Sequence, residues 1–240
     1  MPRAGLRAVL FDAGNTLAHL DYGFIAGVLE AHGHPRTPLE IRIAEYSAKA
    51  AIDQHLTPHT TAVENIEGLL WVDVAHERPS YFGTALRALG VPNAAMQPIL
   101  DALQAHNQEE CLWRVVEPDT ADVLTALRAR GLTLAVISNA DGRIEADLER
   151  YGLRPHFATV VDSYVVGVEK PHPGIFNIAL DRIQATPDTA MYVGDVFSID
   201  VLGARRAGLE AVLLDTLGGY PGNLDCPRIA RLGELLGLLS

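Results

Sequence analysis

Apolar and polar positions follow different patterns on the two sides of residue 116. From about residue 119 onward, short apolar runs rich in β-branched residues alternate with amphipathic segments. Runs with the length and composition of buried parallel strands lie at 132–138, 158–163, 189–195 and 210–216, and a similar run opens the chain at 7–12. This alternation predicts an α/β fold in which a doubly wound parallel sheet carries helices on both faces.

The segments between these runs have helical periodicity, and each starts with a residue that favours a helix N-terminus. The four proposed starting points are Asp119, Asp141, Pro173 and Ser198.

More than a hundred residues separate the first expected strand from the second, and they read as helical. Leu39, Ile43, Tyr46 and Ala50 recur at helical spacing, and the segments 37–40 and 61–64 have the form of capping boxes. We therefore expect an α/β core made of residues 1–17 and 116–240, interrupted by a helical cap at 18–115. Because the insertion directly follows the first strand, we expect it over the carboxyl edge of the sheet, where ligands bind in such folds.

Composition narrows the class of partner. The 240 residues have a formal net charge of −11, which argues against a nucleic-acid or anionic-membrane partner. No stretch approaches the roughly 20 apolar residues of a membrane span, and no signal peptide precedes the first strand. Two cysteines are too few for a disulfide framework, so we expect a soluble cytoplasmic protein. The sequence gives no indication of its oligomeric state.

Candidate catalytic residues lie at or just after the ends of the expected strands. Parallel strands end at one edge of a sheet, so Asp12, Ser138 and Asp195 should converge, with Lys170 following a fourth strand. Two facing carboxylates stay ionised together when a cation lies between them, and hard oxygen donors suit magnesium. Ser138 and the loop amides after it would bind an anion, and Lys170 would add a positive charge. These parts suit transfer of a phosphoryl group to Asp12.

The four segments that contain these candidate residues resemble the motifs of the haloacid dehalogenase-like (HAD) hydrolases. They read LFDAGNTL, VISNA, EKPHPGIF and YVGDVFSID, and they occur in the expected order. The resemblance implies that Asp12 is the nucleophile and that Ser138 and Lys170 hold the phosphoryl oxygens of a small phosphorylated metabolite. It also implies a magnesium site of Asp12, Asp195, Asp200 and the main-chain carbonyl of Gly14. Thr16 and Asn139, which lie in the same motifs, are further substrate-binding candidates.

The chain departs from the phosphatase pattern at Gly14. Phosphatases of this superfamily usually have a second Asp two residues after the nucleophile, which acts as general acid and base. Its absence leaves three alternatives to a phosphatase: a 2-haloacid dehalogenase, a phosphonatase-like hydrolase, and a non-catalytic phosphate-binding relative. Asp195 weighs against the dehalogenase, whose branch lacks the magnesium site. Lys49, the only lysine of the expected cap, leaves the phosphonatase open, although a solvated lysine on an amphipathic helix is the simpler interpretation.

Other polar and aromatic residues have simpler explanations. His19 and Asp21 could replace the missing acid, but a role at the junction with the cap is the simpler expectation. His32 and His34 lack the further ligands that a metal site needs. Trp71, Tyr81 and Phe82 could line a pocket, although helical aromatic residues usually belong to the core.

Overall fold

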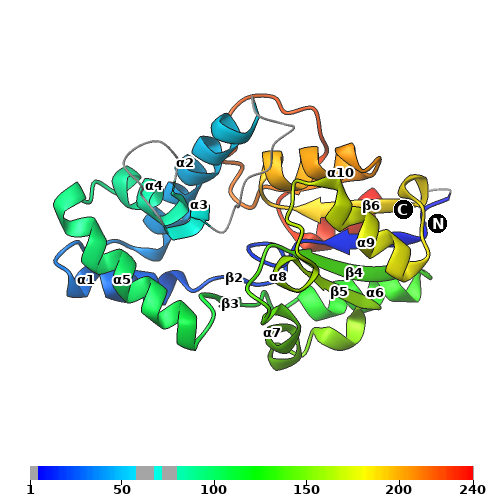
Figure 1. The fold of residues 1–240 in the computed structure, drawn as a ribbon, viewed down its shortest axis with the longest axis horizontal. Coiled ribbons are helices and arrows are strands. Elements are labelled where there is room, and N and C mark those ends of the chain that lie inside the picture. The colour runs from blue at the N-terminus through cyan, green and yellow to red at the C-terminus, as the bar shows by residue number, and fades with distance from the viewer. Residues whose placement is uncertain (1–4, 58–67, 72–79, 240) are drawn as a thin grey trace. The chain divides into compact units, whose positions relative to one another are not determined.

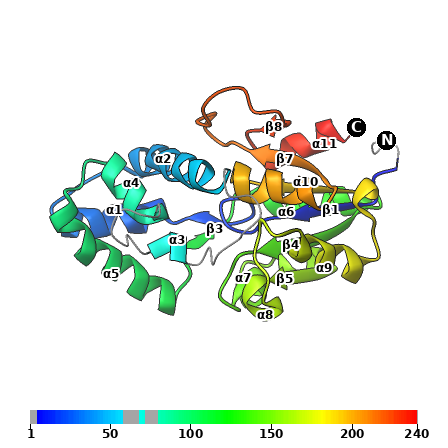
Figure 2. The ribbon, with the colours of Figure 1, turned by 45° about the horizontal axis from the view of Figure 1, so that its top comes forward.

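The computed structural model describes residues 5–57, 68–71 and 80–239. The chain forms two compact units, which Figures 1 and 2 show. The larger unit comprises Met1–His19, Val115–Gly218 and Asn223–Ser240, and the helical unit comprises Leu20–Arg114 and Gly219–Gly222. Residues 219–222 therefore group with the helical unit, rather than with the core range 116–240 expected from the sequence.

The larger unit is built on a parallel sheet of six strands in the order β5-β4-β1-β6-β7-β8. The strands are β1 (Ala8–Phe11), β4 (Thr133–Ser138), β5 (Thr159–Asp162), β6 (Ala190–Gly194), β7 (Glu210–Leu214) and β8 (Arg228–Ile229). The first strand lies inside the sheet, where Phe11 is in register with Val136 of β4 and Val193 of β6. The ends of β1, β4 and β6 are thus neighbours at the carboxyl edge. This topology confirms the predicted α/β class.

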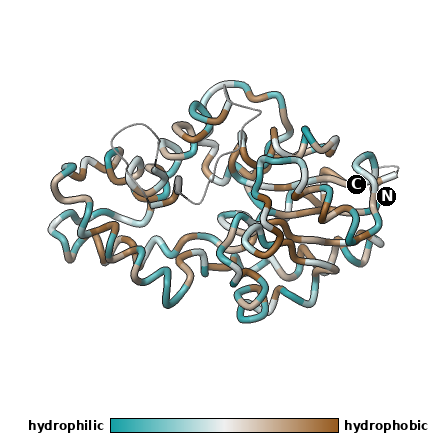
Figure 3. Tube along the Cα trace, in the orientation of Figure 1, coloured by the Kyte–Doolittle hydropathy of each residue, from teal (hydrophilic) through white to brown (hydrophobic). Residues whose placement is uncertain are grey.

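Alternation along the strands gives the sheet two apolar faces, and Figure 3 shows the hydrophobic residues that follow the strands. Val9 and Phe11 face a core cluster that includes Val123 and Leu127 of one helix. Tyr192 points to the opposite face, where its ring meets Phe176 edge-on at 5.0 Å. The helices of this unit are α6 (Thr120–Ala129), α7 (Ile144–Arg150), α8 (Ser163–Val166), α9 (Pro173–Ile183), α10 (Leu202–Arg206) and α11 (Leu235–Leu238), with short 3₁₀ turns at Arg154–His156, Pro187–Thr189 and Leu232–Glu234.

Two of the four predicted helix starts are wrong. Helix α7 begins at Ile144 rather than after Asp141, whose carboxylate instead accepts hydrogen bonds from Arg143. The helix assigned to Ser198 begins earlier, with a π-helical turn at Phe197–Val201 that leads into α10. The π turn carries Asp200, so this local irregularity lies next to candidate site residues.

The helical unit contains α1 (Tyr22–Ala31), α2 (Pro38–Leu56), α3 (Gly68–Trp71), α4 (Tyr81–Ala88) and α5 (Asn93–Glu109). A two-stranded sheet of β2 (His19–Leu20) and β3 (Trp113–Val115) marks two of the places where the chain passes between the units, near residues 20 and 114. The predicted capping box at Thr37 and Glu40 is confirmed, whereas the one at 61–64 lies outside the described residues. None of the helices in the described ranges combines the length and apolar character of a membrane span.

The buried face of α2 differs from the predicted one. Leu39 and Ile43 are exposed, and the buried positions include Glu45 and Lys49. Glu45 accepts hydrogen bonds from the hydroxyls of Tyr22 and Tyr81, which explains how a carboxylate is accommodated in this interior. Because Lys49 is buried, the interpretation of Lys49 as a solvated lysine is wrong. Its ammonium lies 5.2 Å from the centre of the Tyr46 ring.

The predicted aromatic residues of the helical unit pack on one another. Phe82 stacks on Trp71 at 4.5 Å and meets Tyr81 edge-on at 5.4 Å. Tyr81 and Phe82 are buried, which favours a core role for both.

Candidate active site

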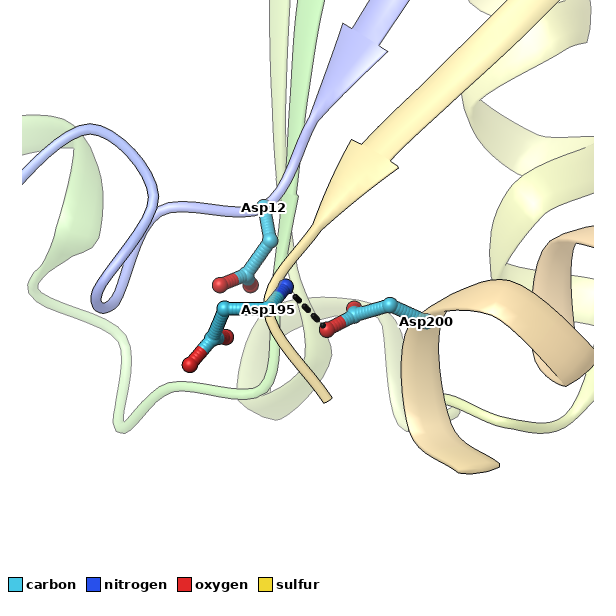
Figure 4. A group of neighbouring side chains, drawn as sticks. All are labelled: Asp12, Asp195 and Asp200. Atoms are coloured by element: carbon cyan, nitrogen blue, oxygen red, sulfur yellow. Dashed lines mark hydrogen bonds between the residues drawn. The ribbon is translucent and has the colours of Figure 1, made fainter. Parts of the chain in front are cut away.

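Asp12 follows β1 directly, and its main-chain amide donates to Val193 of the neighbouring strand β6 at 2.8 Å. Strand pairing therefore fixes the backbone from which the carboxylate projects. Figure 4 shows Asp12 at the end of β1 and Asp195 at the end of β6 with their carboxylates on the same side, while Asp200 reaches in from the following helical turn. One carboxylate oxygen from each of the three aspartates lies within 4.8 Å of the others, and all three residues are buried.

A tight turn follows Asp12. The amides of Leu17 and Ala18 both donate to the carbonyl of Ala13, and Asn15 occupies the left-handed region with a φ of 52°. Asn adopts this conformation more readily than most residues other than Gly. The turn buries Thr16, whose hydroxyl lies 3.4 Å from Asp12 Oδ2. Gly14 lies in the same turn, half-buried, as an isolated β-bridge partner of Ala18.

Asp200 is held by four donors. Its Oδ2 accepts from the main-chain amides of Asp195 at 3.1 Å and Val196 at 2.9 Å, and its Oδ1 accepts from Lys170 Nζ at 2.8 Å and the Tyr192 hydroxyl at 3.1 Å. The carboxylate fits because position 194 is glycine: a Cβ there would lie 2.3 Å from Asp200 Cγ. Asp200 therefore positions the loop that carries Asp195, and both of its oxygens are already occupied.

Lys170 is also fully enclosed. Its Nζ donates to Asp12 Oδ1 at 2.5 Å, to Asp200 Oδ1 at 2.8 Å and to the Tyr192 hydroxyl at 2.9 Å. Its backbone is fixed by Asn139, whose Oδ1 accepts from the Lys170 amide at 2.8 Å while its Nδ2 donates to the Lys170 carbonyl at 2.9 Å. The Asn139 side chain, expected to contact substrate, thus joins the loop after β4 to the segment that carries Lys170.

Ser138 ends β4, in register with Asp162 at the end of β5. The loop that follows it is fixed by that neighbouring strand. Asp162 accepts from the amide of Gly142 at 2.9 Å, and the Ser163 hydroxyl accepts from the amide of Ala140 at 3.1 Å. Ser138 and its loop are therefore anchored at the same edge of the sheet as Asp12.

The electrostatics of the cluster favour a divalent cation. Three carboxylates and one ammonium leave two net negative charges when all four groups are ionised. Burial raises the pKa of Asp12 to about 7, against the opposing effect of Lys170. Burial alone would lower the pKa of Lys170, but Asp12 and Asp200 raise it above its ordinary value, so the ammonium stays charged. A cation between Asp12 and Asp195 would offset the repulsion between these two carboxylates.

Tyr192 also belongs to this cluster, although its place in the sequence does not indicate it. It lies in an apolar strand, where its ring resembles any other core residue, and it is completely buried. A buried tyrosine hydroxyl needs a hydrogen-bonding partner. Tyr192 lies two residues before Gly194, so both face the side of β6 on which Asp200 lies. Burial raises its pKa well above the ordinary value, so the hydroxyl keeps its proton.

Asp21 and His19 were alternatives for the missing acid. Asp21 caps α1 by accepting from the Phe24 amide at 2.8 Å, and it pairs with Arg114 through Nε at 2.9 Å and Nη2 at 2.8 Å. Burial opposes ionisation, but these hydrogen bonds lower the pKa of Asp21 below its ordinary value. These contacts favour a structural role for Asp21. His19 is buried in β2.

Comparison with known proteins identifies the family. The model of the haloacid dehalogenase-like hydrolases matches residues 6–208, and the chain belongs to this family. It is 37% identical over 217 residues to the human haloacid dehalogenase-like hydrolase domain-containing protein 3, covering 88% of this chain and 83% of that protein. It is 30% identical to a glyceraldehyde 3-phosphate phosphatase from Methanopyrus kandleri, covering 86% of this chain and 83% of the relative.

Some relatives are matched over only about half of their length, and solved structures of two enzyme classes share the fold. The mouse and bovine forms of the domain-containing protein 3 are matched over only 51% and 55% of their lengths. A HAD phosphatase structure from Thermococcus onnurineus, at 22% identity and covering 98% of each chain, has a TM-score of 0.61. A dehalogenase structure, at 20% identity and covering 99% of this chain and 98% of the other, has the same TM-score of 0.61. The shared fold therefore does not distinguish phosphatase from dehalogenase.

Proposed function

We propose that this protein is a magnesium-dependent phosphatase that hydrolyses a small phosphorylated metabolite through a phosphoryl group carried on Asp12. The observation that carries the proposal is the buried cluster in which Lys170 Nζ lies 2.5 Å from Asp12 and Asp195 faces the same space. The similarity to a phosphatase over most of the chain supports the same reaction class.

The donor set fits magnesium. Asp12 and Asp195 offer hard carboxylate oxygens, and the two net negative charges of the cluster match one divalent ion. Asp12 and Asp195 would hold the ion, with the Gly14 carbonyl as a further ligand and Asp200 fixing the Asp195 loop from behind. The ion would supply positive charge that offsets the repulsion between the phosphoryl oxygens and the carboxylates.

The residues then have separate tasks. A carboxylate oxygen of Asp12 attacks phosphorus, the bond to the leaving oxygen breaks, and that oxygen takes a proton from solvent because Gly14 offers none. Lys170 offsets the negative charge from beside Asp12, and Ser138 and the amides of its loop donate hydrogen bonds to the transferring oxygens. In the second step, water attacks phosphorus and releases inorganic phosphate and the Asp12 carboxylate. Thr16 supports Asp12 through its hydroxyl.

Release of phosphate from an aryl phosphate, measured with magnesium and with excess chelator, tests this function. We expect metal-dependent turnover that Asp12→Asn abolishes. Asp147→Asn is the matched control, because Asp147 is also a buried aspartate but pairs with Arg150 on α7. Parallel assays for halide release from a 2-haloacid and for cleavage of a phosphonate test the two alternatives. Halide release without phosphate release would replace the phosphatase by a dehalogenase.

A further inference from the structure

Lys170, Asp200 and Tyr192 form a closed triangle of hydrogen bonds, which contacts Asp12 through Lys170 Nζ. Lys170 Nζ donates to both Asp200 Oδ1 and the Tyr192 hydroxyl, and that hydroxyl lies 3.1 Å from the same Asp200 oxygen. The three residues come from three different segments: the chain before α9, the π turn before α10, and strand β6. The triangle thus ties these segments together on one face of the sheet.

The triangle accounts for two of the three N–H groups of the lysine. An ammonium has three donors and no acceptor. With two of them held by Asp200 and Tyr192, the third is directed at Asp12 Oδ1, 2.5 Å away. The direction of that third N–H, and with it the placement of positive charge beside Asp12, is set by groups that do not themselves react.

Burial makes the tyrosine hydroxyl difficult to replace. The Lys170 side chain is 2% exposed and Tyr192 is fully buried, so bulk water does not reach the bond between them. The Tyr192 backbone is fixed by the pairing of β6 with β1 and β7, and Phe176 packs edge-on against the Tyr192 ring. A lysine N–H that lost this acceptor would turn toward the remaining oxygens, because an unsatisfied buried donor is costly.

We infer that Tyr192 is a positioning residue, which aims the Lys170 ammonium at Asp12 and at the phosphoryl group that Asp12 accepts. This inference rests on the proposed function for the roles of Asp12 and Lys170. Tyr192 itself does not contact the reacting atoms. Its contribution is geometric, and it acts through Lys170.

Tyr192→Phe removes the hydroxyl and keeps the ring. Loss of one hydrogen bond to a charged group should lower kcat roughly 10- to 100-fold. The magnesium requirement should change little, because Asp12 and Asp195 remain. Phe176→Leu is the control: it loosens the same packing and lowers Tm, but it leaves the hydroxyl and should keep kcat near the wild-type value.

A double-mutant cycle with Asp200→Asn separates positioning from general destabilisation. If Tyr192 acts through the triangle, adding Tyr192→Phe to Asp200→Asn should lower kcat much less than it does alone. Fully additive losses, or a kcat in Tyr192→Phe that matches the wild type, would overturn the inference. Equal losses of kcat in Tyr192→Phe and Phe176→Leu at equal Tm would also overturn it.

Binding of inorganic phosphate with saturating magnesium, measured by calorimetry, gives a readout independent of turnover. The dissociation constant should rise roughly tenfold in Tyr192→Phe, because the lysine charge is no longer aimed at the anion. Weaker phosphate binding in the variant, together with no turnover in the wild type, would sustain the positioning role and overturn only the phosphatase. Identical binding in the two proteins, or no phosphate binding in either, would contradict the positioning role.

Discussion

Gly194→Ala should disrupt the site by displacing the Asp200 carboxylate. A Cβ at this position would lie 2.3 Å from Asp200 Cγ and 2.6 Å from Asp200 Oδ2. Carbon atoms in contact are separated by about 3.5–4.0 Å, so Asp200 would have to move by more than 1 Å, roughly. Its bonds to the amides of Asp195 and Val196, now 3.1 Å and 2.9 Å, would break.

The expected cost follows from these contacts. Overpacking of an interior site costs about 1–3 kcal/mol, and loss of a hydrogen bond to a buried charged group adds about 1.5–3 kcal/mol. The free energy of unfolding should therefore fall by about 2.5–6 kcal/mol, which lowers Tm by roughly 5–24 °C for a chain of this size. Because Asp200 fixes the Asp195 loop, the stabilisation of the protein by magnesium should fall as well.

Calorimetry with and without magnesium measures both effects. Gly237→Ala is the control, since Gly237 is exposed in α11 of the same unit and a Cβ there would meet no atom within 4 Å. That change should alter the free energy of unfolding by no more than about 1 kcal/mol. If Gly194→Ala kept the wild-type Tm and the wild-type response to magnesium, the account of Asp200 as the support of the metal loop would be refuted.

Three further predictions concern charge and proton transfer at the site. Asp195→Asn should keep the fold but lose most of the rise in Tm on adding magnesium, and a rise as large as in the wild type would remove Asp195 from the metal site. Because burial raises the folded-state pKa of Asp12 to about 7, above its ordinary value near 4, the folded metal-free protein binds the extra proton between these pH values. Its Tm should therefore fall as pH rises through that window, and Asp12→Asn should show a shallower slope; equal slopes would count against the shift. Gly14→Asp should raise the ratio of alkyl to aryl phosphate turnover by part of the roughly 10²–10⁴-fold that acid–base catalysis supplies, whereas an unchanged ratio would mean that another group already provides the proton.

The strand-end residues were predictable because backbone topology alone brings them together. Asp12 and Asp195 follow strands that pair in the sheet, and a parallel register places both at one edge whatever the side chains do. The sequence also pointed to Lys170 as a candidate, although the contacts it makes depend on how α9 and α10 pack.

Tyr192 and α2 show why the rest could not be predicted. A tyrosine inside an apolar strand gives the same pattern as a leucine, and its hydroxyl has meaning only once Lys170 and Asp200 are in place. In α2 the spacing of Leu39 and Ile43 is helical, but tertiary contacts from Tyr22 and Tyr81 bury the polar face instead. Hydrogen-bonding partners distant in the chain decided both cases, and no local pattern encodes them.

A phosphoryl group on Asp12 is the intermediate that the proposed reaction requires, and mass spectrometry can detect it. The protein is incubated with magnesium and acetyl phosphate, quenched in acid, and digested for peptide mass spectrometry. Because Gly14 supplies no base for the second step, the phosphorylated form should accumulate on the peptide that contains Asp12 and be absent from Asp12→Asn. Release of phosphate with no phosphoryl group on Asp12, or with one on another residue, would contradict the account.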